Sequence, residues 1–472
     1  MTGSRDGAVA RAHAAFDDGA FLDRLAAWVA IPTESQVPER TPELHRYVHE
    51  ALVPAFDAMG FDSQVVENSV EGRGPFVVAS RIEDPAKPTL LLYGHGDVVR
   101  AIESEWSEGL KPYELKVVGD RVYGRGTVDN KGQHLIAMMA LESVLAERGG
   151  KLGFNVKFLI ETGEEQGSPG LKAFVDGHKE LLKCDLFAGL DGPRRSFKRM
   201  QLDLGCKGGL FFDLVVDLKR EGGLHSGHWG GVMPDAGIIL AQGIASITTP
   251  QGRILVDEWR PKHIASEVIA AAQDIETDPI PGMPEPDPDW GEVDLGPLAK
   301  SYCWTGFIVL AYQTGNPDNP VNSVPSHAKA RCQIRHTVDI DATQAVSGLQ
   351  RHLDERGLGI VRVTTEGIGR DAFPASRTDL NDPWVQFVAR SMERTTGHPP
   401  NIAPNTAASG PNEMFKAGLD VPTMWIPHSY FGCGQHGPDE HGLKGLFREG
   451  LGVMAALYWD LAEEETPPAR GA

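Results

Sequence analysis

Short apolar runs that end in a histidine or a carboxylate recur along this 472-residue chain. Continuous apolar runs of this length are typical of strands that are buried on both faces. Three strand-like segments precede a polar group: the apolar run 89–93 before His95, the alternating segment 154–160 before Glu164 and Glu165, and the apolar run 186–190 before Asp191. The pattern predicts an α/β fold with these side chains at strand ends.

Asp129 has a different position, because it lies directly before a predicted helix. Apolar side chains recur at helical spacing over residues 135–145, after Asp129-Asn130-Lys131-Gly132. Neighbouring candidates along the chain are about 30 residues apart, which is the length of a strand–helix–strand unit. Open α/β sheets bind ligands beyond the carboxyl ends of their strands, so we expect these distant residues to meet in one crevice.

The chemistry of the candidates indicates metal binding. His95, Asp129, Glu165, Asp191 and His436 offer imidazole and carboxylate ligands without any cysteine. Zinc accepts both ligand types, and a carboxylate-rich set spread along the chain favours a catalytic site over a zinc finger. Manganese and cobalt suit the same ligands.

Four segments, in order over most of the chain, resemble the metallopeptidase family of acetylornithine deacetylase, succinyl-diaminopimelate desuccinylase, glutamate carboxypeptidase and carnosinase. They are Gly94-His95-Gly96-Asp97-Val98-Val99, Gly124-Arg125-Gly126 with Asp129-Asn130-Lys131-Gly132, Glu164-Glu165, and His436-Gly437-Pro438-Asp439-Glu440. The resemblance implies a zinc-exopeptidase-like catalytic domain with a mixed, mostly parallel sheet and a co-catalytic pair of metal ions.

The resemblance also implies a role for each metal ligand. Asp129 would bridge two divalent metals, most simply zinc. His95 and Asp191 would complete one metal site, and Glu165 and His436 the other. The last ligand is open to an alternative, because His441 lies in the same short segment and His428 stands nearby.

Two further residues are implied in catalysis. Glu164 would be the general base for a water activated by the two metals. Asp97 would accept the second ring proton of His95 and fix its tautomer without itself binding metal. An acidic surface turn is the alternative interpretation of Glu164-Glu165.

The middle of the chain predicts an inserted α+β domain. Residues 211–218, 328–338 and 360–365 are strand-like, whereas residues 236–247 and 342–353 are helical. The order resembles the family's ferredoxin-like lid or dimerisation domain, here residues 202–378. Residues 1–201 and 379–472 would then form a discontinuous catalytic domain.

The resemblance implies substrate contacts from four residues. His225, in Leu224-His225-Ser226-Gly227, would stabilise the oxyanion in the partner subunit's active site of a homodimer, with Asn322 assisting. Arg335 would pair with a substrate carboxylate. Ser409 would contact the substrate backbone, although Ala407 and Ala408 precede it where relatives carry glycines. A turn role for His225 and Asn322, a surface ion pair for Arg335 and a helix cap for Ser409 are the alternatives.

Composition excludes some partners. The formal net charge of −20 argues against nucleic acid and anionic membranes. No apolar stretch reaches the length of a membrane span or a secretory signal. Five cysteines without paired spacing suggest reduced thiols and a cytoplasmic protein.

These observations together predict a metal-dependent hydrolase that cleaves an amide or peptide bond of a small substrate. Aspartate at position 191 favours a dipeptidase or related exopeptidase within the family. An N-acyl-amino-acid amidohydrolase is the alternative enzyme. A non-catalytic binding protein on the same scaffold is the alternative from another class.

Overall fold

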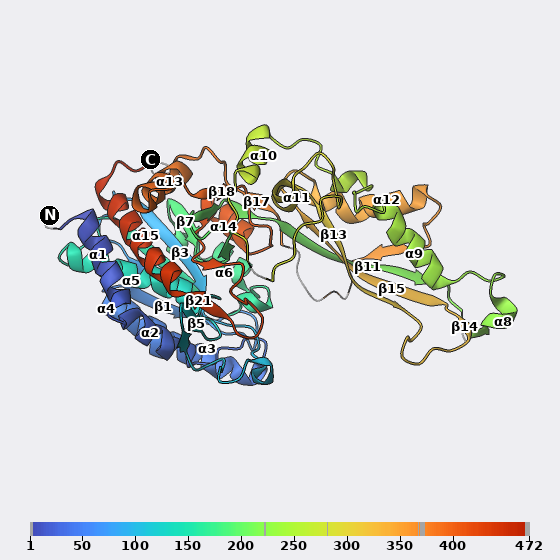
Figure 1. Ribbon diagram of the computed structural model, residues 1–472, viewed down its shortest axis with the longest axis horizontal. Coiled ribbons are helices and arrows are strands. Elements are labelled where there is room, and N and C mark those ends of the chain that lie inside the picture. Colours follow the sequence, from blue (N-terminus) through green and yellow to red (C-terminus); the bar gives the residue numbers. More distant parts are fainter. Residues whose placement is uncertain (1–2, 221–222, 281, 367, 369–372, 468–472) are drawn as a thin grey trace.

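The computed structural model describes residues 3–220, 223–280, 282–366, 368 and 373–467. Its two main sheets have eight and four strands. The smaller sheet extends away from the larger one as an arm, which makes the molecule elongated (Figure 1). In the part of the chain that the structure describes, no helix is both long and apolar enough to cross a membrane.

The eight-stranded sheet is mixed. Its strands, in sheet order, are β1 (Asp62–Val66), β2 (Phe76–Arg81), β6 (Asn155–Glu161), β3 (Thr89–His95), β7 (Leu186–Gly189), β19 (Thr423–Trp425), β9 (Gln201–Asp203) and β18 (Asn401–Ala403). Pairs β6–β3, β3–β7, β7–β19 and β9–β18 are parallel, and the other three are antiparallel. The predicted fold class, α/β with a mixed and mostly parallel sheet, is confirmed.

Strand β3 shows why the apolar runs form central strands. Leu90 and Leu92 belong to the hydrophobic core on one face of the sheet, whereas Leu91 and Tyr93 belong to the core on the other face. All four side chains are buried. A run without polar residues is therefore what this position requires, since side chains alternate between two covered faces.

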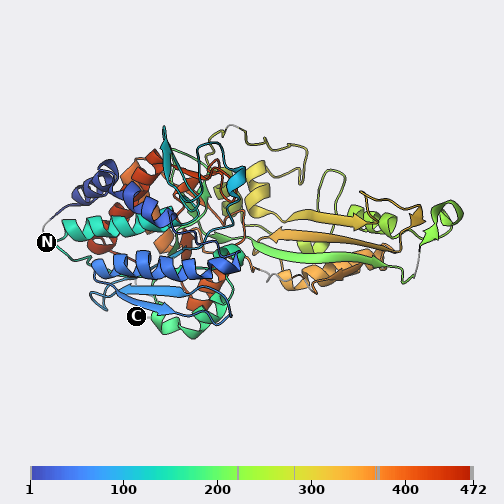
Figure 2. The same cartoon turned by 90° about the horizontal axis from the view of Figure 1, so that it is seen from below.

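Helices cover both faces. The first core includes residues of α1 (Arg5–Asp17), α2 (Ala20–Val29), α3 (Thr41–Tyr47), α4 (Val53–Ala58), α5 (Lys131–Glu147), α13 (Pro383–Thr396) and α15 (Lys444–Glu463). The second core includes residues of α6 (Leu171–Gly177), α7 (Lys179–Leu182) and α14 (Asn412–Leu419). Helices α1, α5 and α15 lie side by side on the first face (Figures 1 and 2).

The four-stranded sheet is entirely antiparallel. Its order is β13 (Gly306–Thr314), β15 (His327–His336), β11 (Gly208–Asp217) and β16 (Arg362–Thr364). Helices α9 (Ala236–Ile247) and α12 (Ala345–Glu355) share one core with this sheet, around the buried Trp259. Strand β13 forms an edge whose residues 308–313 are exposed.

Smaller elements connect the two sheets and close the end of the arm. Strand β10 (Gly205–Cys206) pairs with β17 (Ser376–Arg377) where the chain passes between the sheets. Helices α10 (Ser266–Gln273) and α11 (Pro297–Cys303) pack with Ala403 of β18. At the far end of the arm lie β14 (Ser323–Val324) and α8 (Ser226–Trp229), beside β12 (Leu224–His225), which pairs with β14 (Figure 1). The division at residues 202 and 378 stays a prediction.

Three further strands form a small sheet beside the large one. β21 (His441–Leu443) pairs with β5 (Arg121–Tyr123), which pairs with β4 (Lys116–Val118). A second short pair joins β20 (Ser429–Tyr430) to β8 (Pro193–Arg194). These contacts bring the segment after β20 next to the loop that carries Asp129.

Candidate metal centre

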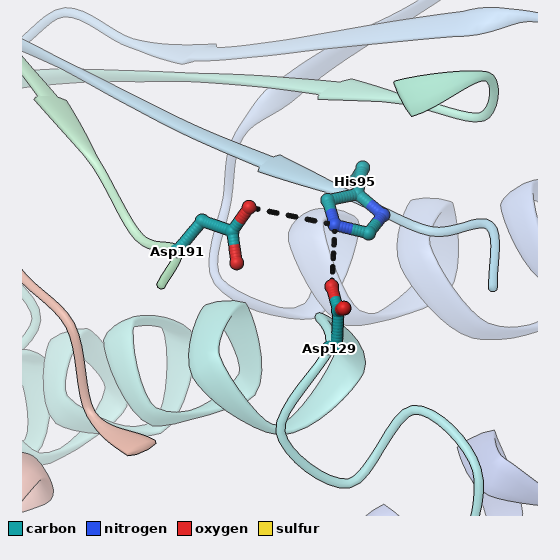
Figure 3. A group of neighbouring side chains, drawn as sticks. All are labelled: His95, Asp129 and Asp191. Atoms are coloured by element: carbon teal, nitrogen blue, oxygen red, sulfur yellow. Dashed lines mark ion pairs between the residues drawn. The ribbon is translucent and has the colours of Figure 1, made fainter. Parts of the chain in front are cut away.

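Three of the predicted ligands meet at the carboxyl ends of β3 and β7. His95 is the last residue of β3, Asp191 follows β7, and Asp129 precedes α5. The Nε2 atom of His95 lies 3.0 Å from Asp129 Oδ1 and 3.7 Å from Asp191 Oδ2. Figure 3 shows the two carboxylates converging on this nitrogen.

A second group forms around the other oxygen of Asp129. His436 Nε2 lies 3.0 Å from Asp129 Oδ2 and 3.3 Å from Glu165 Oε2. We call the groups His95, Asp129, Asp191 and Asp129, Glu165, His436 the two trios. In each trio, the side-chain nitrogen and oxygen atoms lie close enough together to bind one metal ion. Because Asp129 turns one oxygen toward each trio, its position is that of a carboxylate that bridges two ions.

The residues present fit a pair of divalent cations. His95 Nε2 and Glu165 Oε1 are buried and make no hydrogen bond of normal geometry within the described chain. Buried polar atoms without a partner are costly unless something else satisfies them. Imidazole and carboxylate are also the ligands that zinc takes at catalytic sites.

The ionisable groups of the site also indicate that it binds cations. Burial is the main cause that raises the pKa of Glu164 and Glu165 well above the ordinary value, and it raises the pKa of Asp191 to about 6. Burial raises the pKa of Asp129 too, but the contacts with His436 and His95 outweigh it and lower that pKa overall. Several acids crowded in one buried place favour cations.

His95 is held by the segment that follows it. Its Nδ1 lies 3.0 Å from the backbone oxygen of Asp97 and 3.4 Å from the carboxylate Oδ1 of the same residue. The Asp97 carboxylate accepts hydrogen bonds from the backbone N–H groups of Glu164 and Glu165, at 3.2 and 3.1 Å. Asp97 therefore links the histidine to the acidic pair rather than facing the two trios.

A buried ion pair orders the two loops that carry Asp129 and His436. Arg125 Nη1 donates to Glu440 Oε2 at 2.6 Å, and Arg125 Nη2 donates to the backbone oxygen of Gly437 at 2.7 Å. Glu440 also accepts from the backbone N–H groups of Gly126, Val128 and Asp129. We call this unit the Arg125–Glu440 brace.

The sequence motifs contained both members of this brace, yet their spacing gave no sign that they would pair. The structure also adds Gln435, whose side-chain amide donates to Asp129 Oδ2 at 2.8 Å. No pattern in the sequence distinguishes Gln435 from an ordinary loop residue. Proximity in the fold alone identifies it.

The other two candidate histidines occupy different surroundings. His441 Nε2 bonds to the Tyr430 hydroxyl at 2.6 Å, and its Nδ1 lies 2.8 Å from the Asp439 backbone oxygen. His428 is buried, and burial lowers its pKa to about 3. Neither belongs to the two trios, whereas His436 does.

A cavity of about 660 Å³ opens on this cluster, lined among others by Asp129, Glu164, Asp191 and His436. Arg335 of β15 and Ser409 line it as well. The two approach each other across Gly209, where a Cβ atom would lie 2.9 Å from Ser409 Oγ and 3.5 Å from Arg335 Nη1. Burial lowers the pKa of Arg335. The cavity size is that of a small-molecule site.

His225 and Asn322 lie elsewhere. His225 is exposed and precedes α8, at the end of the arm remote from the large sheet (Figure 1). The backbone oxygen of Asn322 accepts a hydrogen bond from Ser226 there. The structure thus keeps these two residues together but does not bring them to the two trios of their own chain.

Comparison with known proteins identifies the family. Residues 91–460 match the model of Peptidase family M20/M25/M40. The chain belongs to this family. The match spans all five residues of the two trios, and the resemblance drawn from the sequence motifs is confirmed.

Individual relatives of this M20/M25/M40 peptidase are dipeptidases. The chain is 31% identical over 470 residues to Beta-Ala-His dipeptidase of Rattus norvegicus, covering 94% of this chain and 93% of the relative. It is 28% identical over 320 residues to Cysteinylglycine-S-conjugate dipeptidase of Corynebacterium striatum, covering 66% and 67% of the two chains.

Solved structures show the same fold. The di-peptidase Dug1p from Saccharomyces cerevisiae matches with a TM-score of 0.77 at 20% identity, over 98% of this chain and all of that one. Human carnosine dipeptidase 1 matches with a TM-score of 0.74 at 22% identity, over 97% of this chain and all of that one.

Proposed function

We propose that this M20/M25/M40 peptidase is a metal-dependent dipeptidase. The observation that carries the proposal is the position of Asp129, which turns one carboxylate oxygen toward each of two ligand trios beside a substrate-sized cavity. Its dipeptidase relatives cover nearly the whole chain. Hydrolysis of a small peptide is the reaction that this arrangement and this family membership support together.

The ligands would be His95 and Asp191 for one ion, Glu165 and His436 for the other, and Asp129 for both. Zinc fits this set, and manganese and cobalt fit it as well. Two bound ions would supply Lewis-acid chemistry, polarising the scissile carbonyl and lowering the pKa of water.

Glu164 is the proposed proton carrier. It lines the cavity beside Asp129 and Asp191, and burial raises its pKa well above that of a free glutamate. A carboxylate with a raised pKa is a better base near neutral pH. Glu164 takes the proton of the attacking water and returns it to the amine that leaves.

Arg335 is the proposed anchor for the substrate's free carboxylate, since it lines the cavity and makes no ion pair among the described residues. Its guanidinium can bind a carboxylate through two parallel hydrogen bonds. Ser409, whose buried Oγ has no partner among the described residues, would contact the substrate backbone beside it.

We further propose a homodimer. His225 precedes α8, and Asn322 bonds to the first residue of α8, which lies at the far end of the arm (Figure 1). These two residues would therefore stabilise the oxyanion in a partner subunit. The exposed apolar edge of β13 supports such an assembly. A cytoplasmic location is also proposed, because all five cysteines are free.

A substrate panel tests the proposal. The protein loaded with zinc, manganese or cobalt is expected to hydrolyse dipeptides faster than N-acyl-amino acids and N-carbamoyl-amino acids. Glu164→Gln should keep its metal content while kcat falls by about 10²–10⁴-fold. Faster hydrolysis of the acylated substrates would show that the protein is an amidohydrolase and not a dipeptidase. Full activity of Glu164→Gln would show that this residue is not the general base.

A further inference from the structure

The substrate cavity contains a carboxylate that none of the proposed catalytic steps uses. Asp203, on β9, lines the same cavity as Asp129, Glu164 and Arg335, and it is 3% exposed. It is paired in register with Trp425 of β19, which also lines the cavity. Asp203 therefore belongs to the cavity lining and not to the two trios.

The neighbours of Asp203 fix its carboxylate without neutralising it. Gln201 Nε2 donates to Asp203 Oδ1 at 2.9 Å, and Gln201 Oε1 in turn accepts from the backbone N–H of Arg195. These two bonds set the orientation of the Gln201 amide. Among the described residues, the Asp203 carboxylate forms no other hydrogen bond and no ion pair.

The nearby cation is engaged elsewhere. Arg195 Nε donates to the Tyr302 hydroxyl at 2.5 Å, and its guanidinium lies over the rings of Phe431 and Tyr302. Burial raises the pKa of Asp203 to about 7, because the opposing effects of the Gln201 hydrogen bond and of Arg195 are smaller. A buried carboxylate without a cation is costly, and a positively charged group brought by a ligand would remove that cost.

We propose that Asp203, beside Gln201, Tyr302 and Trp425 in the cavity lining, forms a subsite for a protonated amine of the substrate. The inference rests on the proposed dipeptidase function and narrows its substrate class. Arg335 binds a carboxylate and Asp203 binds an ammonium group, so the cavity selects a zwitterionic or basic peptide. The amine is either the α-amino group or a basic side chain.

Direct binding tests this subsite without relying on turnover. Calorimetry on the slowed, metal-loaded Glu164→Gln protein compares the binding of Lys-Gly and Gly-Lys with that of their norleucyl counterparts, and the binding of Ala-Gly with that of N-propionyl-glycine. The protonated member of at least one pair should bind about tenfold or more tightly, the effect of one charge-assisted hydrogen bond. The pair that shows the difference identifies the source of the amine. Equal binding within every pair would overturn the proposal.

Adding Asp203→Asn to the same protein should reduce the ratio of the affinities for the protonated and the uncharged peptide of that pair by about tenfold. Asp62→Asn is the control, because this exposed aspartate lies on the edge strand β1, six strands away from β9 in the same sheet. Metal content and thermal unfolding report whether the variant folds. An unchanged ratio in folded Asp203→Asn would overturn the subsite alone, whereas a changed ratio with no hydrolysis by the wild type would overturn the dipeptidase function alone.

Discussion

Glu440 contacts none of the side-chain atoms that face each other in the two trios, yet its hydrogen bonds hold the loops that carry Asp129 and His436. The Arg125–Glu440 brace binds the backbone of residues 126–129 on one side and the backbone of Gly437 on the other. Asp129 ends the first loop, and His436 directly precedes the contact in the second. The brace therefore acts as a positioning unit for the two residues that define the second trio.

Replacing Glu440 with glutamine should weaken metal binding by about 10–100-fold, as changes in residues that orient metal ligands do. The change leaves Arg125, which is 2% exposed, without its counter-charge. Loss of one partner of a buried ion pair costs about 3–5 kcal/mol of stability. Competition with a metal-sensitive dye measures the affinity, and denaturant unfolding measures the stability.

The control for this change is Glu50→Gln, which removes an exposed ion pair with Arg46. Exposed pairs contribute little, so this variant should match the wild type within about 0.5 kcal/mol. Wild-type metal affinity in folded Glu440→Gln would show that the brace does not position Asp129 and His436.

At the scale of single residues, the sequence predicted which side chains form the two trios better than it predicted their neighbours. His95, Asp129, Glu165, Asp191 and His436 follow from strand ends and family motifs, because both depend on local sequence. The contacts of Gln435 and Asp203 arise from tertiary packing, and a polar side chain in a loop or a short strand carries no sign of them in the sequence.

At the scale of elements, strand length decided what could be predicted. Strands β3, β6 and β11 have long apolar or alternating runs, and the predicted ranges overlap them closely. Strand β9 has only three residues, two of them polar, so periodicity could not reveal it. Its neighbours β18 and β19 are equally short. The part of the cavity wall that β9 and β19 form could therefore not be predicted from the sequence.

The edge strand β13 carries the prediction about assembly. Ile308, Val309, Leu310 and Tyr312 are exposed on an unpaired edge, a feature that proteins normally protect. We expect this edge to be buried in a symmetric dimer. Leu310→Lys should shift the protein from dimer to monomer in sedimentation velocity, with a loss of activity because His225 would no longer reach a partner.

Val118→Lys supplies the comparison for that experiment. Val118 on β4 is 51% exposed, close to the 50% of Leu310, but it lies in the small sheet beside the large one. This variant should remain dimeric. A wild-type protein that is monomeric and fully active would contradict both the dimer and the role of His225 across subunits.

At the scale of the whole molecule, the buried ionisable groups of the site make the stability of the folded protein depend on metal binding and on pH. The pKa values of Glu164, Glu165 and Asp191 are raised, chiefly by burial. The pKa of His436 is raised by its contact with Asp129. Groups with raised pKa values in the folded protein stabilise it below their unfolded values, and this contribution is lost as the pH rises through the folded values.

The metal-free protein should therefore lose stability from this cluster as the pH rises, for Asp191 between about pH 4 and pH 6 and for His436 above about pH 6.5. Divalent cations bind the deprotonated ligands and reverse this trend. The difference in Tm between the metal-loaded and the chelator-treated protein is thus expected to widen from pH 5 to pH 8. A difference that stays constant or narrows over this range would contradict the assignment.

The arrangement of the two sheets was partly predictable for a simple reason. A long insert with its own strands and helices must form its own core, and residues 208–217, 327–336 and 345–355 do so. The packing of α10 and α11 against β18 was not predictable, because nothing in their sequence specifies a partner in another sheet.

If two cations share Asp129, the ions can be located in crystals grown with zinc and measured above and below its absorption edge. Two anomalous peaks are expected, one bounded by His95, Asp129 and Asp191 and the other by Asp129, Glu165 and His436. A single peak, or peaks that leave Asp129 without a metal contact, would contradict the proposal that two cations share this residue.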